Sequence, residues 1–299
     1  MKRSTQPKIS VIMSIYNQWN KIQLEEAVES VLKQTFSDFE FIIYNDGSDQ
    51  VVFEYLQKYA ALDERIVLIN NSVNHGLAYS LNTCIDVAKG KYLARMDDDD
   101  ICAPDRLMAQ YEFMEAHPEI AYVGCNAMLI DDKGVWGIRR MPENPGKQDF
   151  LRFSPFIHPT VMIRRSIFDG TTAYRSSKAT WRCEDYELFM RLYKLGHRGC
   201  NMQQELFFYR EDRKSYKKRK LKYRIDEMRL RYRNFSEMGL MYPFGWLFVV
   251  RPLVAAFIPS GIIYVIKKLY HKQEKENGKR IGQEIKSVSE NLEKRPDAV

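Results

Sequence analysis

The chain has 299 residues, of which 45% are hydrophobic and 28% are charged, and its formal net charge is +7. This balance excludes a disordered, collagen-like or low-complexity protein, because such chains lack apolar residues or repeat Gly and Pro. A chain of about 300 residues buries about three quarters of its unfolded surface, so it can form a core without disulfides or a structural metal. Its length predicts one or two domains.

The positive charge is concentrated towards the carboxyl end. Residues 1–209 contain 24 basic and 28 acidic side chains, whereas residues 210–299 contain 22 basic and 11 acidic ones. The first part therefore carries a net charge of −4 and the second +11. We expect the amino-terminal part to hold the functional site and the carboxyl-terminal part to meet an anionic partner, either a nucleic acid or a membrane surface.

The five cysteines are widely spaced and include no CxxC pair. This pattern favours a reducing compartment and argues against a structural metal site. The apolar run 9–16 follows Lys2 and Arg3, but it is interrupted by Ser10 and Ser14 and lacks a small-residue cleavage site. We interpret it as a buried strand and not as a secretion signal.

Strand and helix patterns alternate along the first hundred residues. Short apolar runs that end at Asn, Asp or Gly predict strands at 9–16, 39–44, 66–69 and 92–96. Apolar residues at helical spacing predict helices that include 24–31 and 77–88. This alternation predicts an α/β fold, with a mostly parallel sheet flanked by helices and a ligand crevice beyond the carboxyl ends of the strands.

Polar residues follow each of these four predicted strands, for example Asn17 after the first and Asn45 and Asp46 after the second. Such residues also form turns and cap helices, so each one is consistent with a purely structural role. The turns contain neither GxGxxG nor GxxxxGK[ST], which argues against dinucleotide-dependent redox chemistry and P-loop hydrolysis. A nucleotide at this edge would be held by carboxylates, amides and a metal ion.

Four consecutive aspartates, Asp97 to Asp100, follow the fourth predicted strand. One interpretation is a solvated loop ahead of a helix that begins near Pro104. The other is a site for Mg²⁺ or Mn²⁺, with oxygen ligands from the protein and from a diphosphate. Asp97 and Asp99 are two residues apart on an extended or turning segment, so they would point to the same side and could share a nucleotide and its metal.

At six places the sequence resembles the ordered motifs of family 2 glycosyltransferases. The segments are KISVIMSIYN (8–17), FEFIIYNDGSDQ (39–50), NHGLAYSLN (74–82), ARMDDDDICAPDRL (94–107), HPTVMIRRS (158–166) and CEDYELFMRL (183–192). They cover about residues 8–200 in the order and spacing of the family. The resemblance implies a GT-A fold and an inverting, metal-dependent transfer of a hexose from a nucleotide-diphospho-sugar, in bacterial cell-surface polysaccharide biosynthesis.

The resemblance also implies which residues bind the donor. The base and ribose would be held by residues after the first two strands, namely Tyr16, Asn17, Asn45 and Asp46. By the resemblance a UDP-sugar is favoured. Asn45 stands where many members have aspartate, and its amide oxygen can accept a hydrogen bond from a uracil N–H, but without the charge of a carboxylate. Further donor contacts are expected from Asn74, Gly76, Arg95, Asp97, Asp98 and His158. His158 lies on a strand-like segment and could equally be a hydrogen-bonded structural histidine.

The metal and the general base are implied in the same way. Asp97 and Asp99 match the DxD positions, with Asp99 as the direct ligand of Mn²⁺ or Mg²⁺, and Asp98 stands where a small residue is usual. Asp185, in the Glu184–Asp185 pair, matches the base that takes the proton from the acceptor hydroxyl. Helix capping alone would also explain this pair. We expect the helix to have an apolar face of Leu188, Leu192 and Leu195 and to stop at Gly196. Trp181, Arg182 and the loop 170–178 are expected to line the acceptor cleft.

The carboxyl-terminal region combines a basic cluster with an apolar stretch. Residues 210–233 contain 12 basic and 4 acidic side chains, and residues 244–266 contain Arg251 as their only charge. The apolar stretch is long enough to span a bilayer. However, Pro252 and Pro259 divide it and basic residues flank both ends, so we favour attachment to one anionic membrane face over a span or a soluble helical subdomain.

Together these patterns predict three regions: a GT-A catalytic domain at 1–210, a basic and apolar membrane-associating helical region at 211–271, and a charged tail at 272–299. We expect a peripheral or monotopic enzyme on the cytoplasmic face of the cell membrane, with a saccharide or lipid-linked acceptor.

Two other functions agree with parts of the sequence. A sugar-phosphate nucleotidyltransferase could use similar carboxylates, but the sequence shows no basic, glycine-rich triphosphate loop near its amino terminus. A nucleic-acid binder could use the basic tail, but that tail adjoins an apolar stretch in place of a recognition motif, so no nucleic acid partner is expected.

Overall fold

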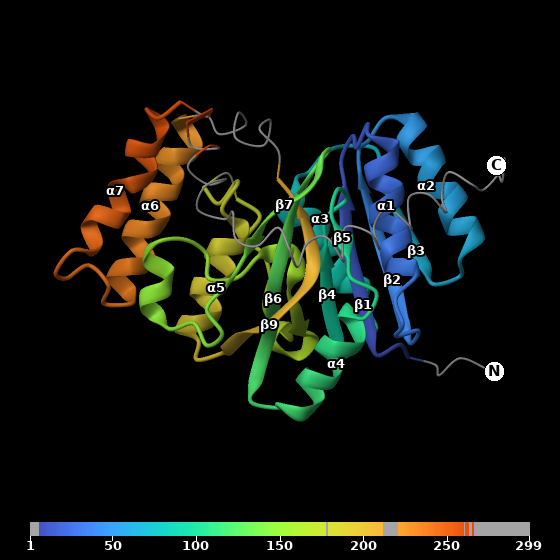
Figure 1. Ribbon diagram of the computed structural model, residues 1–299, viewed down its shortest axis with the longest axis horizontal. Coiled ribbons are helices and arrows are strands. Elements are labelled where there is room, and N and C mark those ends of the chain that lie inside the picture. Colours follow the sequence, from blue (N-terminus) through green and yellow to red (C-terminus); the bar gives the residue numbers. More distant parts are fainter. Residues whose placement is uncertain (1–5, 178, 212–220, 260, 263–264, 266–299) are drawn as a thin grey trace.

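The computed structural model describes residues 6–177, 179–211, 221–259, 261, 262 and 265. Its nine-stranded sheet has the order β3-β2-β1-β4-β8-β6-β9-β5, and β7 pairs with β6 beside this path (Figure 1). The strands are β1 (Ile9–Ile15), β2 (Phe39–Asp46), β3 (Ile66–Asn71), β4 (Tyr92–Met96), β5 (Ile101–Cys102), β6 (Ile120–Asp131), β7 (Gly134–Arg139), β8 (Met162–Arg164) and β9 (Arg198–Arg210). The helices are α1 (Lys21–Leu32), α2 (Gln50–Leu62), α3 (Leu77–Val87), α4 (Arg106–Ala116), α5 (Glu184–Lys194), α6 (Leu221–Glu237) and α7 (Gly245–Ala256), with short 3₁₀ helices η1 (Lys147–Leu151), η2 (His158–Thr160) and η3 (Arg165–Phe168).

The first four predicted strands form the parallel half of this sheet. β1 pairs in parallel with β2 and β4, and β2 pairs in parallel with β3. Ile9 lies opposite both Phe39 and Tyr92, so the strands start level and their following turns meet at one edge. The structure therefore confirms the α/β sheet and the placement of its turns. The predicted strand 66–69 continues to Asn71.

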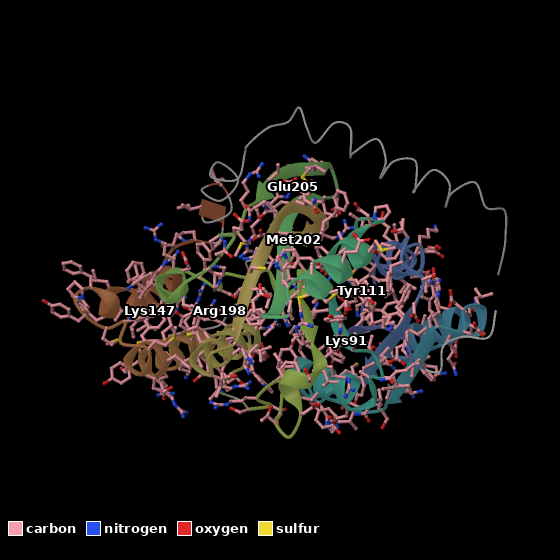
Figure 2. All side chains as sticks on the ribbon, turned by 90° about the horizontal axis from the view of Figure 1, so that it is seen from below. Lys91, Tyr111, Lys147, Arg198, Met202 and Glu205 are labelled. Atoms are coloured by element: carbon pink, nitrogen blue, oxygen red, sulfur yellow. The ribbon has the colours of Figure 1, made fainter. Side chains whose placement is uncertain are left out.

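Helices cover both faces of this half because its strands are apolar on both sides. Leu24 and Val28 of α1 and Leu56 of α2 pack with one set of buried strand residues. Leu81 of α3 packs with the opposite set, which includes Ile12 and Ile42. Figure 2 shows side chains filling the layers around the sheet.

The second half of the sheet is mixed. β8 is antiparallel to β4 and β6, β6 is parallel to β9, and β5 is antiparallel to β9. The segment HPTVMI is strand-like in sequence, but His158 lies in η2, and β8 begins at Met162. The expected strand position of His158 is therefore wrong. Pro159 has no N–H to donate to a ladder, which favours this short turn over a strand.

Helix α5 begins at Glu184 and is followed by Gly196, whose positive φ of 85° ends the helix as predicted. Leu188 and Leu192 are buried, but Leu195 is 63% exposed. The prediction that Leu195 belongs to the apolar face is wrong, because the helix has ended at Lys194 and Leu195 is its cap.

Helices α6 and α7 pack together at one end of the molecule, beyond α5 (Figure 1). Phe235, Leu240 and Val249 join the core cluster that also contains Phe150 and Tyr186. The guanidinium of Arg231 lies 4.9 Å from the ring centroid of Tyr186 and donates a hydrogen bond to a carbonyl of η1 at 2.9 Å.

Within the part of the chain that the structure describes, no helix is both long and apolar enough to cross a bilayer. Residues 212–220 of the basic cluster and the predicted tail 272–299 lie outside the described residues.

Candidate functional site

Asp46, at the end of β2, joins the second and third turns of the parallel edge. Its buried carboxylate accepts hydrogen bonds from Asn74 Nδ2 (3.0 Å), His75 N (2.8 Å) and Gly76 N (2.8 Å). Gly47 follows with a φ of +73°, and a Cβ there would lie 2.6 Å from Asn74 N. Only glycine fits this contact between the two turns. The structure thus brings together Asp46, Asn74 and Gly76. The hydrogen bonds of the Asp46 carboxylate are made largely to groups of the protein itself.

Asn17 and Asn45 are linked through the turn after β2. Asn45 Nδ2 donates to Asn70 Oδ1 at 2.7 Å, and its Oδ1 accepts from Ser48 N at 3.3 Å. Asn17 Oδ1 accepts from Asp49 N at 2.9 Å, and Asn17 N donates to Ser48 Oγ at 2.9 Å. These bonds fix the first two turns against each other. The Asn45 amide oxygen, predicted to accept a hydrogen bond from the base, accepts one bond from Ser48 N and has a second lone pair. Tyr16, beside them, is exposed.

The aspartate turn after β4 is held by two arginines. The buried guanidinium of Arg95 forms an ion pair with Asp97. Arg210, at the end of β9, donates from its backbone N to Asp100 Oδ1 (2.6 Å) and from Nε to the Asp99 carbonyl (2.7 Å). Its Nη2 also reaches Glu26 on α1 at 2.7 Å. Arg210 therefore fixes the backbone of the turn.

Negative charge accumulates in this turn. Burial, and then the neighbouring carboxylates of Asp99 and Asp97, raise the pKa of both Asp98 and Asp100 well above the usual range. Among the described residues, the buried Oδ2 of Asp100 has no hydrogen-bond partner.

These observations fit a divalent cation at Asp97 and Asp99, because a cation would offset the crowded charge. Within the described ranges, no group of three or more His, Cys, Asp or Glu side chains is arranged to hold a metal. A cation here would therefore need oxygen ligands from a bound diphosphate or from water, as expected for Mg²⁺ or Mn²⁺.

The Glu184–Asp185 pair occupies the first turn of α5, where unpaired backbone N–H groups favour negative charge. Burial, opposed by backbone hydrogen bonds and assisted by the Asp185 charge, raises the pKa of Glu184. Arg182 precedes the pair with a φ of +68°, a conformation that non-glycine residues seldom adopt. Trp181 and Arg182, which precede the pair, are exposed.

Tyr174 and His158 lie between the aspartate turn and α5. His158 Nε2 is 2.7 Å from the Tyr174 hydroxyl. Burial, and then the nearby Arg95 guanidinium, hold the pKa of His158 well below its usual range, so the ring is neutral. Burial raises the pKa of Tyr174, and the charges of Asp185 and Asp97 raise it further while Arg95 opposes them. The charges of the predicted metal ligand Asp97 and of the predicted base Asp185 therefore both affect the pKa of Tyr174.

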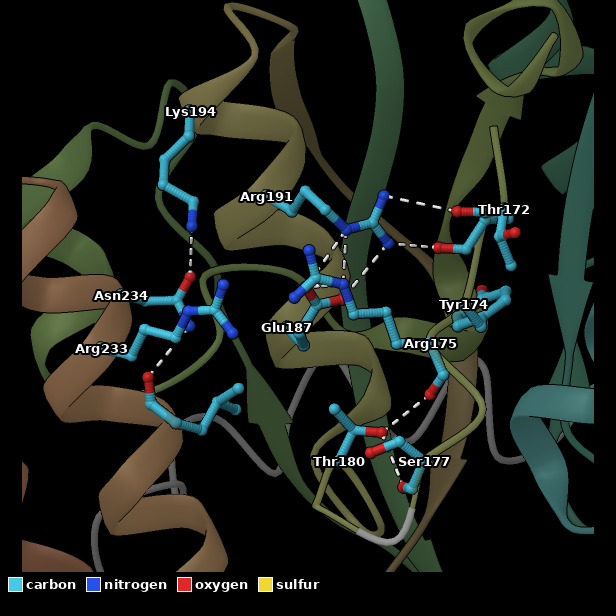
Figure 3. Close-up of polar contacts among 12 residues, drawn as sticks. Thr172, Tyr174, Arg175, Ser177, Thr180, Glu187, Arg191, Lys194, Arg233 and Asn234 are labelled. Atoms are coloured by element: carbon cyan, nitrogen blue, oxygen red, sulfur yellow. Dashed lines mark hydrogen bonds and ion pairs between the residues drawn. The ribbon is translucent and has the colours of Figure 1, made fainter. Parts of the chain in front are cut away.

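The loop that carries Tyr174 is fixed from two sides. The side-chain amide of Asn82 on α3 pairs with the backbone of Tyr174, accepting from its N at 2.9 Å and donating to its O at 2.8 Å. On the other side, buried Glu187 of α5 binds Arg191 Nε (3.1 Å) and Arg175 Nε (3.2 Å), and Arg191 also donates to the Ala173 carbonyl (Figure 3).

The motifs did not single out Asn82, Arg210 or Ser48, and Tyr174 was included only as part of the loop 170–178. Asn82 and Ser48 fall inside two of the recognised motifs, so their polar side chains could have been singled out. Arg210 and Tyr174 act across 110 and 16 residues of chain, respectively, and no local pattern marks them.

The sequence profile described as "Glycosyl transferase family 2" matches residues 10–239 of the chain. The chain belongs to glycosyl transferase family 2. This confirms the family that the motifs indicated.

Two curated relatives agree with this membership of glycosyl transferase family 2. EpsE of Bacillus subtilis (strain 168), whose name marks it as a candidate glycosyltransferase, is 37% identical over 274 residues, which cover 91% of this chain and 96% of EpsE. The amylovoran biosynthesis glycosyltransferase AmsE of Erwinia amylovora is 31% identical over 195 residues, which cover 64% of this chain and 72% of AmsE.

Solved structures of similar fold include TarS residues 1–349 of S. aureus in complex with UDP, with a TM-score of 0.57, 18% identity, and coverage of 77% of this chain and 72% of that one. The mannosyltransferase PcManGT of Pyrobaculum calidifontis, in complex with GDP-Man and Mn²⁺, also has a TM-score of 0.57, with 14% identity and coverage of 98% and 89%. These similarities confirm the GT-A fold of this family 2 chain.

Proposed function

We propose that this family 2 glycosyltransferase transfers a hexose, with inversion, from a UDP-sugar to a hydroxyl group of a saccharide acceptor in cell-surface polysaccharide biosynthesis. The observation that carries the proposal is the position of Tyr174. This buried residue interacts electrostatically with Asp97 of the aspartate turn and with Asp185 of α5. Asp97, proposed for the leaving group, and Asp185, proposed for the acceptor, therefore both lie near Tyr174.

The donor would lie along the parallel edge. The turns containing Asn17, Asn45 and Asp46 are rigid because they are bonded to one another, so they offer a preformed surface for the base and ribose. A bound UDP in the structural neighbour TarS supports uracil as the base.

Asp97 and Asp99 are proposed to hold Mn²⁺ or Mg²⁺ with the donor diphosphate. When bound, the ion would stabilise the negative charge of the departing diphosphate, so the protein needs no acid to protonate that group. Asp97 would bind both the ion and Arg95, and the ion pair with Arg95 keeps the Asp97 carboxylate oriented. Neutral His158, beside Arg95, contributes no positive charge of its own.

The proton of the acceptor hydroxyl would pass to Asp185. The carboxylate lies at the amino end of α5, where the helix favours its ionised form. Attack on the face of the anomeric carbon opposite the diphosphate gives inversion in one step, for which a single base is sufficient. Burial raises the pKa of Glu184, the other carboxylate of the pair.

We further propose a lipid-linked acceptor and a location on the cytoplasmic face of the cell membrane. The name of AmsE, an amylovoran biosynthesis glycosyltransferase, supports a role in building a saccharide. The strongly basic residues 210–299 support proximity to anionic lipids.

A panel of nucleotide-sugars with Mn²⁺ would test the reaction. We expect one or more UDP-sugars to raise the melting temperature and to be slowly hydrolysed to UDP, and both effects to disappear with EDTA. Stabilisation by GDP-sugars alone would disprove the uracil assignment. Release of pyrophosphate from a nucleoside triphosphate and a sugar phosphate would instead identify a nucleotidyltransferase.

A further inference from the structure

Helix α7 and the turn before it expose an unusual set of large apolar side chains. Tyr242 is 91% exposed, Phe244 65% and Phe257 85%. The remaining exposed members are Trp246, Leu247, Val250, Val254 and Ile258. We call these eight residues the α7 outer face. Scattered apolar residues are ordinary on a protein surface, but a contiguous set of this kind marks an interaction site.

The helical spacing separates this face from the one that packs on the domain. Gly245, Val249 and Pro252 are buried and recur at i, i+4 and i+7, so they form the inner side of α7. Trp246, Val250, Val254 and Phe257 recur at i, i+4, i+8 and i+11 on the other side. Because the inner side packs along most of the length of α7, the helix lies flat on the protein. Its outer face is exposed along the length of the helix.

The stretch of sequence that contains α7 carries charge of one sign. No Asp or Glu occurs in the sequence between Glu237 and Glu274, whereas Arg251, Lys267, Lys268 and Lys272 do. Arg251 lies at the edge of the outer face and donates a hydrogen bond to the Arg152 carbonyl, so its charge is held at this boundary. An apolar helix face with aromatic residues at both ends and an arginine at its edge has the composition of a helix that lies in the membrane interface.

We propose that the α7 outer face docks onto an anionic phospholipid bilayer, with α7 parallel to the membrane plane and its aromatic residues among the headgroups. The proposal deepens, and rests on, the membrane location proposed above. It has a consequence for the site, since Lys194 of α5 is bonded to Asn234 of α6 at 2.6 Å. Docking of α7 would therefore hold α5, and Asp185 with it, at a fixed height above the bilayer.

Flotation of the full-length protein with lipid vesicles tests this. The vesicles contain phosphatidylglycerol and phosphatidylcholine, or phosphatidylcholine alone. We expect binding to the mixed vesicles, and a loss of about tenfold or more in the partition coefficient for the Phe244→Ser/Phe257→Ser double variant. The matched control is Ile22→Ser/Leu62→Ser, which removes two equally exposed apolar side chains from α1 and α2, at the far end of the molecule from α7 (Figure 1).

A second measurement uses the wild-type protein and one conservative variant of the face. Trp246 should be quenched by lipids brominated on the acyl chain near the headgroup, and Trp246→Phe should remove most of that quenching. The other tryptophans, Trp19, Trp136 and Trp181, lie outside the outer face and supply the background signal.

Several results would overturn the proposal. One is equal flotation of the double variant and the wild type, and another is no binding of the wild type to either kind of vesicle. A third is flotation without quenching of Trp246, which would assign binding to the basic tail. Sedimentation showing a wild-type dimer that becomes a monomer in the double variant would assign the face to a second copy of the chain. Stabilisation by UDP-sugars, measured on the same samples, reports the proposed reaction separately, so either idea can fail alone.

Discussion

The Nε2 atom of His158 lies 2.7 Å from the hydroxyl oxygen of Tyr174, and both residues are in the electrostatic field of Arg95. This pair sits between the two sets of carboxylates on which the proposed transfer depends. It gives the predictions on protonation and on loop position a common structural basis.

Protonation of His158 should destabilise the fold. Its pKa in the folded protein is held well below its usual range, whereas in the unfolded chain it is about 6.5. Below that value the unfolded state binds more protons, so the free energy of unfolding should fall as the pH drops from about 7.5 to about 5.5. Urea unfolding of the wild type and His158→Gln checks this. A variant whose stability changes with pH as steeply as that of the wild type would contradict it.

Loss of the Tyr174 hydroxyl should loosen the centre of the site. Tyr174→Phe removes the partner of His158 and should lower the free energy of unfolding by about 1 kcal/mol. The backbone bonds to Asn82 remain, so binding of UDP should be preserved. Tyr79→Phe, on the exposed side of α3, serves as the control. An unchanged stability of Tyr174→Phe would show that this hydrogen bond contributes nothing.

Replacement of the proposed base should separate binding from transfer. Asp185→Asn keeps the shape of the side chain but cannot accept the acceptor proton, so kcat should fall by about 10²-fold or more. The dissociation constant for the UDP-sugar, measured by calorimetry, should change little. Asp86→Asn, which alters an exposed aspartate on α3, should keep normal turnover. Near-normal kcat in Asp185→Asn would exclude the residue as the base.

The aspartate turn should lose its metal response when Asp99 is changed. Asp99→Ala is expected to abolish the increase in UDP-sugar affinity that Mn²⁺ produces in the wild type, because a carboxylate ligand is gone. Titrations with and without Mn²⁺ provide the measurement. Asp105→Ala alters an exposed aspartate that makes no side-chain cap bond, so it should retain the response. A normal Mn²⁺ effect in Asp99→Ala would remove Asp99 from the metal site.

Buried Glu187 should be important for stability as well as for the loop. Glu187→Ala leaves the guanidinium of Arg191 without its main partner in a largely buried position and should cost about 3 kcal/mol in unfolding free energy. Glu119→Ala, which removes an exposed carboxylate, should cost less than about 0.5 kcal/mol. Denaturation curves that show equal, small losses for the two variants would mean that the cluster does not hold the loop.

The sequence was informative where residues act through their neighbours in the chain. The strand beginning at Ile9 and the turn at Asn45 could be placed because buried parallel strands are continuous apolar runs with polar ends. The pairing of β6 with β9 could not be, since it joins segments far apart in sequence and its register shifts several times. His158 was misplaced for a local reason, because its segment has strand composition but contains a proline.

For the candidate site, the sequence predicted the residues but not their contacts. Motifs identified Asp46, Asp99 and Asp185 by residue type and spacing, yet they carried no information on what these groups contact. The carboxylate of Asp46 accepts hydrogen bonds from the turn before α3, and Arg210 of β9 binds the aspartate turn. Both contacts join segments that only the three-dimensional fold brings together.

The sheet order has an evolutionary consequence. The strands of residues 9–96 all lie on one side of the pairing between β4 and β8, and those of residues 101–210 lie on the other. Three residue pairs, Tyr92 with Arg164, Leu93 with Ile163 and Ala94 with Met162, form this seam. An exchanged second segment, with the loop that precedes Asp185, would also have to keep the contacts that cross this seam, such as Asn82 with Tyr174 and Arg210 with Glu26. We expect homologous recombination near Asp100 to yield enzymes that share a donor but differ in the saccharide they extend.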